Sequence, residues 1–285
     1  MAEVFDSTRC TLGEGALWHP KRQELIWFDI LGKKMFRKGS GETIVTALDE
    51  VSSAAFWVDA ARIVVATQTA LVLRNLDTGE TEKLVDLEAD NAVTRSNDGR
   101  ADPWGGLWIG TMGFKAEKEA GAFYRYYKGE LRQLFPDITI PNSTCFAPDR
   151  SRAYFSDTAQ GKLFTVTLDK DGWPDAAPEV LVDFTASGLN PDGAVTDATG
   201  NLWIAFWGAA QVGVYSPTGT QIASHSMDAA QVTCPAFGGS DLTTLFCTSA
   251  SEGLSEDERA KFAGTGMVFV QPNAGQGREE YAVLL

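Results

Sequence analysis

The chain has 285 residues and a formal net charge of −14 at pH 7, and 44% of its residues are hydrophobic. This charge argues against nucleic-acid binders and binders of anionic membranes, because both classes present basic patches. The sequence contains no run of about 18 apolar residues, and its first residues lack the basic and apolar regions of a signal peptide. We therefore expect a cytoplasmic, acidic monomer that acts without nucleic acid or membrane.

The cysteines lie far apart and form no Cys-x-x-Cys pair. They are Cys10, Cys145, Cys234 and Cys247. A disulfide framework or a thiolate zinc site would show closer and more regular spacing. We expect reduced side chains in the core or in a pocket.

Six segments of the chain share one layout: a polar or glycine-rich start, a short apolar strand, a turn and a second strand. The second strands are centred on Ile26, Val64, Trp108, Tyr154, Trp203 and Phe246. These centres are roughly 40–50 residues apart, which is the spacing of propeller blades. The spacing favours a repeat architecture over a single irregular all-β fold.

A second hairpin follows each segment. Its first strands are predicted at 34–37, 71–74, 122–125, 163–166, 212–215 and 267–270. Two hairpins per unit make a four-stranded sheet, and six units predict an all-β, six-bladed β-propeller that spans residues 1–285 as one domain. A pair of β-sandwiches is the alternative, but it does not explain the alternation of inner and outer hairpins.

Three local predictions accompany this architecture. The sequence around Asn190-Pro191-Asp192-Gly193 is typical of a turn, and Asp197 to Gly200 of a second, tight turn. The residues 3–5 and 280–284 are strand-like, so we expect the two ends of the chain to pair in one blade and close the ring. The residues 255–262 predict a short helix with Ser255 as N-cap and Glu258 in capping-box position.

Candidate functional groups lie where the innermost strands begin, because these starts meet at one end of a propeller channel. Glu14, Asn142 and Asp192 form a set of oxygen donors there. Oxygen ligands suit hard divalent ions such as Ca²⁺, Mg²⁺ or Mn²⁺. Zn²⁺ more often takes nitrogen or sulfur, and neither His19 nor His225 lies at such a start.

Each of the three residues also has an ordinary structural interpretation. Glu14 between two glycines could be a solvated loop acid, Asn142 follows a proline as turn residues do, and Asp192 lies in a Pro-Asp-Gly turn composition. Their occurrence at the starts of three repeat units favours a shared site.

Several motifs together resemble the gluconolactonase/regucalcin (senescence-marker-like) family. They are Gly13-Glu14-Gly15, Arg95-x-Asn97-Asp98-Gly99, Gly110-Thr111-Met112, Pro141-Asn142-Ser143 and Asn190-Pro191-Asp192-Gly193, the last followed by Gly200-Asn201-Leu202-Trp203. They fall in order on successive blades and cover nearly the whole chain. The resemblance implies a six-bladed propeller that hydrolyses sugar lactones with one divalent ion, Ca²⁺ first, with Mg²⁺, Mn²⁺ or Zn²⁺ as alternatives.

Matching the motifs residue by residue implies roles for individual side chains. The metal ligands become Glu14, Asn142 and Asp192, and Asp192 is also the acid/base. Arg95 and Asn97 become the pair that contacts the sugar. Apart from these motifs, the aromatic residues Trp207, Phe114, Phe146 and Phe237 are candidate walls of the pocket, although core positions are the more common role of such residues.

One departure from the resemblance concerns specificity. Some relatives carry a substrate-contacting acid shortly after Gly-Thr-Met, whereas this chain has Lys115. Lys115 is either a flexible surface lysine or, with Arg95, a recognition element for an anionic lactone such as an aldarolactone.

Two other classes of function use the same scaffold. A calcium-binding regulatory propeller with weak or vestigial lactonase activity is the principal alternative. A propeller that serves only as an interaction platform gives no role to the polar residues at the strand starts.

Overall fold

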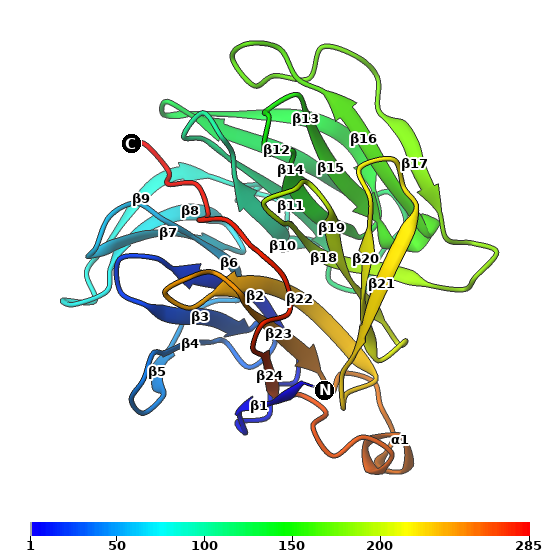
Figure 1. Cartoon of the computed structure of the whole chain (residues 1–285). Coiled ribbons are helices and arrows are strands. Elements are labelled where there is room, and N and C mark those ends of the chain that lie inside the picture. The colour runs from blue at the N-terminus through cyan, green and yellow to red at the C-terminus, as the bar shows by residue number, and fades with distance from the viewer. Residues whose placement is uncertain (1) are drawn as a thin grey trace.

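The computed structural model describes residues 2–285, which form six four-stranded antiparallel sheets and almost no helix. Figure 1 shows the sheets arranged as blades around a central axis, with the chain passing once around the ring. The predicted six-bladed β-propeller is confirmed.

The innermost strands are β2 (Gly13–His19), β6 (Ser52–Trp57), β10 (Thr94–Ala101), β14 (Pro141–Phe146), β18 (Asn190–Thr196) and β22 (Gln231–Gly238). The second strands are β3 (Glu24–Asp29), β7 (Arg62–Thr67), β11 (Leu107–Gly113), β15 (Arg152–Asp157), β19 (Leu202–Trp207) and β23 (Thr244–Ala250). Each innermost strand contacts the innermost strands of both neighbouring blades, and β22 contacts β2 to complete the circle. These strands are almost entirely buried, as the apolar runs in the sequence require.

The third strands are β4 (Lys34–Lys38), β8 (Ala70–Asn75), β12 (Gly121–Tyr127), β16 (Lys162–Thr167), β20 (Gln211–Tyr215) and β24 (Val268–Gln271). The outermost strands are β5 (Ile44–Ala47), β9 (Thr81–Asp86), β13 (Glu130–Ile138), β17 (Glu179–Asp183), β21 (Gln221–Ser226) and β1 (Glu3–Asp6). Hydrophobic clusters fill the spaces between blades; one of them joins β2 and β3 to β6 and β7. In another, Trp108 packs edge-on against Phe146 of the next blade, with 5.4 Å between ring centroids.

A register shift occurs in each of the six innermost strands, close to its start. Such a bulge places two residues opposite one and changes the direction of the nearby side chains. In β2 and β14 the shift follows Glu14 and Asn142, whereas in β18 it begins at Asp192 itself. The bulges therefore decide which side chains face the axis.

The ring closes through the two ends of the chain, but not through the segment that the sequence suggested. β1 pairs with β24, where Glu3 lies opposite Val270 and Val4 opposite Phe269. The expected pairing of residues 3–5 with residues 280–284 is wrong, because the second hairpin of the last blade lacks its own fourth strand and β1 takes that place.

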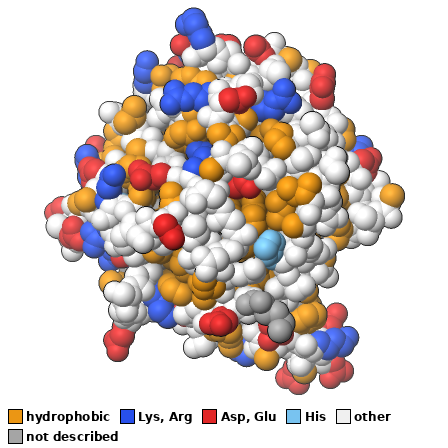
Figure 2. Space-filling model, viewed as in Figure 1, with side chains coloured by type: hydrophobic (Ala, Val, Ile, Leu, Met, Phe, Trp, Pro, Cys, Tyr) orange, Lys and Arg blue, Asp and Glu red, His pale blue; other side chains and the backbone are white. Residues whose placement is uncertain are grey.

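The residues 273–285 instead form what we call the C-terminal strap. It crosses the face of the ring at which the innermost strands end (Figure 1). Its backbone hydrogen-bonds to turns and strand ends of different blades: Ala198 N donates to Gln276 O at 2.9 Å, and Val283 N donates to Trp57 O at 2.9 Å. On the face drawn in Figure 2, acidic and basic side chains are interspersed without a large patch of one sign.

The other local predictions have mixed outcomes. The turn at Asp197 is confirmed, with Gly200 N donating to Asp197 O at 3.1 Å, but Asn190–Gly193 belongs to strand β18. The helix is confirmed as α1 (Glu256–Ala260), with the capping box between Ser255 and Glu258. Within residues 2–285, no helix has the length and apolar character needed to cross a bilayer.

Candidate active site

A cavity of about 400 Å³ lies at the end of the channel where the innermost strands begin, which we call the open end. All six residues that the sequence nominated line it: Glu14, Arg95, Asn97, Lys115, Asn142 and Asp192. Residues from β2, β10, β14 and β18 therefore meet in one cavity, as the common direction of the innermost strands requires.

A pair of buried carboxyl groups, Glu14 and Asp192, lies at the centre of this residue set. The two residues are 8% and 3% exposed, and their side chains lie close enough to shift each other's pKa. Burial, reinforced by the nearby charge of Asp98, raises the pKa of Glu14 to about 8. Burial and the charge of Glu14 raise the pKa of Asp192 well above its ordinary value. Two carboxyls in contact cannot both ionise without a compensating cation.

Asp98 is a third carboxyl at this end, and sequence analysis noted it only as part of a motif. It is buried, its pKa is raised by burial, and its Oδ2 accepts a hydrogen bond from Thr144 N at 2.7 Å. Its place directly after Asn97, inside the bulge of β10, is the signal that could have identified it.

The side-chain amides are held by a chain of hydrogen bonds across three blades. Arg95 Nη1 donates to Asn97 Oδ1 at 2.8 Å, and Asn97 Nδ2 donates to Asn142 Oδ1 at 3.0 Å. Asn142 Nδ2 then donates to Thr158 Oγ1 at 2.8 Å, and that hydroxyl donates to Pro191 O at 2.6 Å. This chain fixes the orientation of the Asn142 amide, whose oxygen keeps a second lone pair for another partner.

Arg95 supplies positive charge to the cavity. Its side chain is buried, and the charges of Glu14, Glu252 and Asp192 act on it. Among residues 2–285, no group accepts a hydrogen bond from its Nε. Its Nη1 holds both the side chain of Asn97 and the backbone carbonyl of Ser96, and the residue lines the cavity.

The rim of the cavity carries two exposed charges of opposite sign. Lys115 follows β11, and Glu252 follows β23. Sequence analysis missed Glu252, because the loop after β23 carries no repeat motif. Thr158, which directly follows β15 and also lines the cavity, was missed as well, because it lies outside the repeat motifs.

Only part of the predicted aromatic wall is present. Trp207 and Phe114 line the cavity. Phe146 and Phe237 do not, because their rings are buried in the hydrophobic clusters between blades. The apolar lining is completed by Leu12, Met112 and Ile140.

The donor set fits a hard cation. The cavity offers two carboxyl groups and an amide oxygen, which are ligands that Ca²⁺, Mg²⁺ and Mn²⁺ accept. Within residues 2–285, no group of three His, Cys, Asp or Glu side chains is arranged to hold a metal, since the third nominated ligand is an asparagine. The contact between two buried carboxyl groups is the physical indication of a missing positive charge.

Comparison with known proteins agrees with these motifs. Residues 12–251 match the family described as the SMP-30/Gluconolactonase/LRE-like region. The chain belongs to this family. The resemblance inferred from the sequence motifs is thereby confirmed.

Relatives in the SMP-30/gluconolactonase family cover almost the entire chain. A putative sugar lactone lactonase from Rhizobium meliloti is 38% identical over 96% of this chain and 94% of its own. A 6-deoxy-6-sulfogluconolactonase from Pseudomonas putida is 32% identical over 90% of each. A crystal structure of regucalcin from Agrobacterium tumefaciens, described as a calcium-binding protein, superimposes with a TM-score of 0.97 at 39% identity, covering 100% of this chain and 98% of that one.

Proposed function

We propose that this protein hydrolyses a sugar lactone to the sugar acid, with Asp192 as general acid/base and one divalent cation held by Glu14, Asn142 and Asp192. The observation that supports this most is the pair of neighbouring, buried carboxyls that line a cavity of about 400 Å³. Such a pair is costly to bury without a cation.

The class of enzyme rests on the family. Relatives that are 28–38% identical and span nearly the whole chain carry lactonase names, including an L-arabinolactonase and a pentonolactonase. The prediction of a lactone-hydrolysing enzyme is confirmed at this level. The roles of individual residues and the identity of the cation belong to the proposal.

The chemistry of the site follows from the carboxyl of Asp192. A bound divalent ion would polarise the lactone carbonyl and stabilise the oxyanion that water attack creates. One carboxylate oxygen of Asp192 is then available to take a proton from the attacking water and later deliver it to the ring oxygen that leaves. Glu14 holds its carboxyl beside that of Asp192, and Ser143 Oγ, which donates to the Asp192 carbonyl, fixes the backbone from which Asp192 projects.

In this proposal, the hydrogen-bonded residues Arg95 and Asn97 orient the substrate. The free donors of Arg95 can bind ring hydroxyls or a carboxylate, and Asn97 Oδ1 can accept from a hydroxyl. Lys115 on the rim adds a second positive charge, which favours an anionic lactone. A relative of this chain is named for a sulfo-sugar lactone.

The decisive experiment measures hydrolysis of a panel of sugar lactones by pH-stat. Wild-type protein is stripped with chelator and restored with each divalent ion in turn, and Asp192→Asn is run beside it. We expect turnover that disappears with chelator and returns with Ca²⁺ or another divalent ion. Turnover that is unchanged by chelator, or that persists in Asp192→Asn, would contradict the proposal.

A regulatory calcium-binding protein is the second candidate, since the regucalcin structure is described as that of a calcium-binding protein. Both candidates predict Ca²⁺ binding, which calorimetry detects without any lactone. Binding without hydrolysis of any lactone in the panel would favour the second candidate. The cytoplasmic location remains a prediction, and the burial of all four cysteines is compatible with it.

A further inference from the structure

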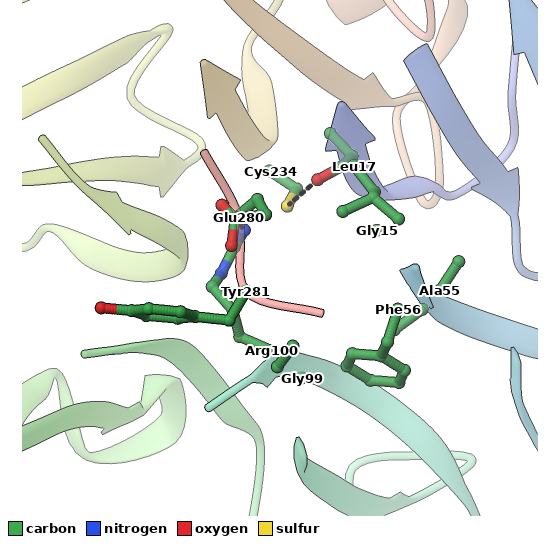
Figure 3. A pocket seen from close by; sticks show the side chains of 12 residues that line it. Gly15, Leu17, Ala55, Phe56, Gly99, Arg100, Cys234, Glu280 and Tyr281 are labelled. Carbon is green, nitrogen blue, oxygen red and sulfur yellow. Dashed lines mark hydrogen bonds and ion pairs between the residues drawn. The ribbon is translucent and has the colours of Figure 1, made fainter. Parts of the chain in front are cut away.

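The opposite end of the channel, which we call the closed end, is blocked by the C-terminal strap. Glu280 and Tyr281 lie between the innermost strands there, next to Gly15, Leu17 and Arg100 (Figure 3). The space left among them has a volume of about 10 Å³, which is room for a single water. Substrate and product must therefore use the open end.

Arg100 makes the central contacts at the closed end. Its Nη1 donates to Glu280 Oε1 at 2.7 Å. Its Nε donates to Thr144 O at 3.1 Å, and its Nη2 donates to Ala194 O at 2.9 Å. A single guanidinium group thus ties β10 to β14, to β18 and to the strap.

The two carbonyls bound by Arg100 belong to the strands of the candidate ligands. Thr144 lies two residues after Asn142, and Ala194 lies two residues after Asp192. Thr144 lies within the bulge of β14, and Ala194 is the first residue after the bulge of β18. A change in the spacing of β10, β14 and β18 at this level would alter the relative positions of Asn142 and Asp192.

Glu280 is the ionic partner that holds Arg100 in place. Both side chains are about 5% exposed, so the pair is shielded from water. Burial alone would lower the pKa of Arg100, but Glu280, as the largest of several negative influences that include Asp98, helps to raise that pKa above its ordinary value. The strap holds Glu280 at a fixed position along the channel, because Trp57 Nε1 donates to Glu280 O at 2.8 Å.

We propose that Glu280 and Arg100 are positioning residues for the site at the open end. The strap brings Glu280 into the channel, Glu280 orients Arg100, and Arg100 sets the spacing of the strands that carry Asn97, Asn142 and Asp192. This inference rests on the proposed function, because the residues that Glu280 and Arg100 position include the candidate ligands of the cation.

The test compares Glu280→Gln with Glu279→Gln. The two variants make the same carboxylate-to-amide change at neighbouring strap positions. Within residues 2–285, the one salt bridge of Glu279 is with the exposed Lys21, at 3.8 Å, whereas Arg100 pairs with Glu280. Ca²⁺ affinity is measured by calorimetry without substrate, kcat and KM are measured on the best lactone, and Tm is recorded for each variant with chelator.

For Glu280→Gln we expect Ca²⁺ affinity and kcat to fall by about 10–100-fold, as for other groups that orient metal ligands through a second layer of contacts. Glu279→Gln is expected to match wild type within about twofold, because exposed ion pairs contribute little. Assays are run far below the lowest Tm, so that a loss of global stability by itself moves neither affinity nor kcat.

Arg100→Lys provides a second variant that keeps the charge but loses the fork of donors. If it folds, it is expected to lose Ca²⁺ affinity even though Glu280 retains a cationic partner. Wild-type affinity in both Glu280→Gln and Arg100→Lys, with only Tm reduced, would overturn the positioning role. Failure of the wild-type protein to bind any divalent ion or open any lactone would instead contradict the proposed function.

Discussion

The two ends of the channel carry buried charges that are balanced very differently. At the closed end, Arg100 and Glu280 form a salt bridge at 2.7 Å, and Arg100 uses its other nitrogens on backbone carbonyls. At the open end, Glu14 and Asp192 lie close together. Burial and the charge of Asp98 raise the pKa of Glu14, and burial and the charge of Glu14 raise that of Asp192. The same innermost strands therefore support one pair of opposite charges and one pair of like charges.

The difference indicates where the fold is complete and where it requires a ligand. In a buried pair of opposite charges, each member neutralises the other. A buried pair of like charges is stable only with a proton or a cation between its members. Groups with strongly perturbed pKa values cluster at functional sites. The strap closes one end of a common scaffold, and the candidate site lies at the other.

The largest expected effect comes from removing the acid at the open end. Asp192→Asn is expected to lower kcat by about 10²–10⁴-fold, the usual contribution of a general acid/base. The fold should persist, because asparagine keeps the size of the side chain and relieves the contact between like charges. Rates by pH-stat and circular dichroism of the same samples measure the two quantities. A cooperative unfolding transition lost together with activity would show that Asp192 is primarily structural.

At the closed end, the corresponding change is expected to act on stability. Arg100→Met leaves Glu280 buried without its partner and is expected to cost about 3–5 kcal/mol in the free energy of unfolding. Replacing both Arg100 and Glu280 with Met should recover much of this loss. The exposed pair of Arg132 and Glu130 is the control, for which the same changes should cost less than about 1 kcal/mol. Denaturant melts provide the values, and equal costs at both pairs would contradict the contrast between buried and exposed pairs.

The sequence predicted the ring but not all of its closure. Apolar strands at regular spacing determine blades, because each sheet must bury both faces against its neighbours. The last blade could not be assigned correctly, since β1 and residues 280–284 are both strand-like and only the register with β24 decides between them. Because β1 pairs with β24, residues 280–284 have no partner strand and lie in the strap. Sequence patterns do not indicate that such a segment will cross the channel.

The site was predictable where it coincides with the repeat and not elsewhere. Glu14, Asn142 and Asp192 precede or begin bulges that recur in every blade, so their motifs mark one end of the axis. Glu252 lies in the loop between β23 and β24, which carries no repeat motif, and its proximity to Arg95 appears only in three dimensions. The Pro-Asp-Gly composition suggested a turn because bulges and turns use the same residues.

The third prediction concerns pH and cation together. Because burial raises the pKa of Glu14 to about 8, its proton stabilises the metal-free fold at low pH. That contribution is complete below the ordinary pKa of about 4.5 and is lost as the pH rises through about 8. Wild-type protein in chelator should therefore lose roughly a few kcal/mol of stability, relative to Glu14→Gln, between pH 6 and 9.

Saturating Ca²⁺ should remove this loss and release protons on binding, so that affinity increases with pH. Denaturant melts at each pH, with and without Ca²⁺, measure both effects. His19, whose pKa is lowered by burial, titrates in wild type and Glu14→Gln alike, so the difference between the two reports the titration of Glu14 together with its effect on Asp192. A constant difference across this pH range would mean that Glu14 is not protonated in the metal-free protein.

The smallest effect is expected at the rim, where charges are exposed and screened. Lys115→Ala should raise KM for an anionic lactone by no more than about fivefold, because exposed charge pairs contribute up to about 1 kcal/mol. KM for a neutral gluconolactone should not change, and added salt should reduce the difference. Lys118→Ala is the matched control, since Lys118 pairs with Glu119 and does not line the cavity.

Glu252→Gln should act in the opposite direction. The Glu252 carboxylate and an anionic substrate are both attracted to Arg95. Removing the charge of Glu252 should therefore lower KM for the anionic lactone. Opposite shifts in these two variants would assign specificity to the rim and leave catalysis to the buried pair below it. Equal shifts for neutral and anionic lactones would mean that Lys115 acts on the shape of the loop after β11 and not on substrate charge.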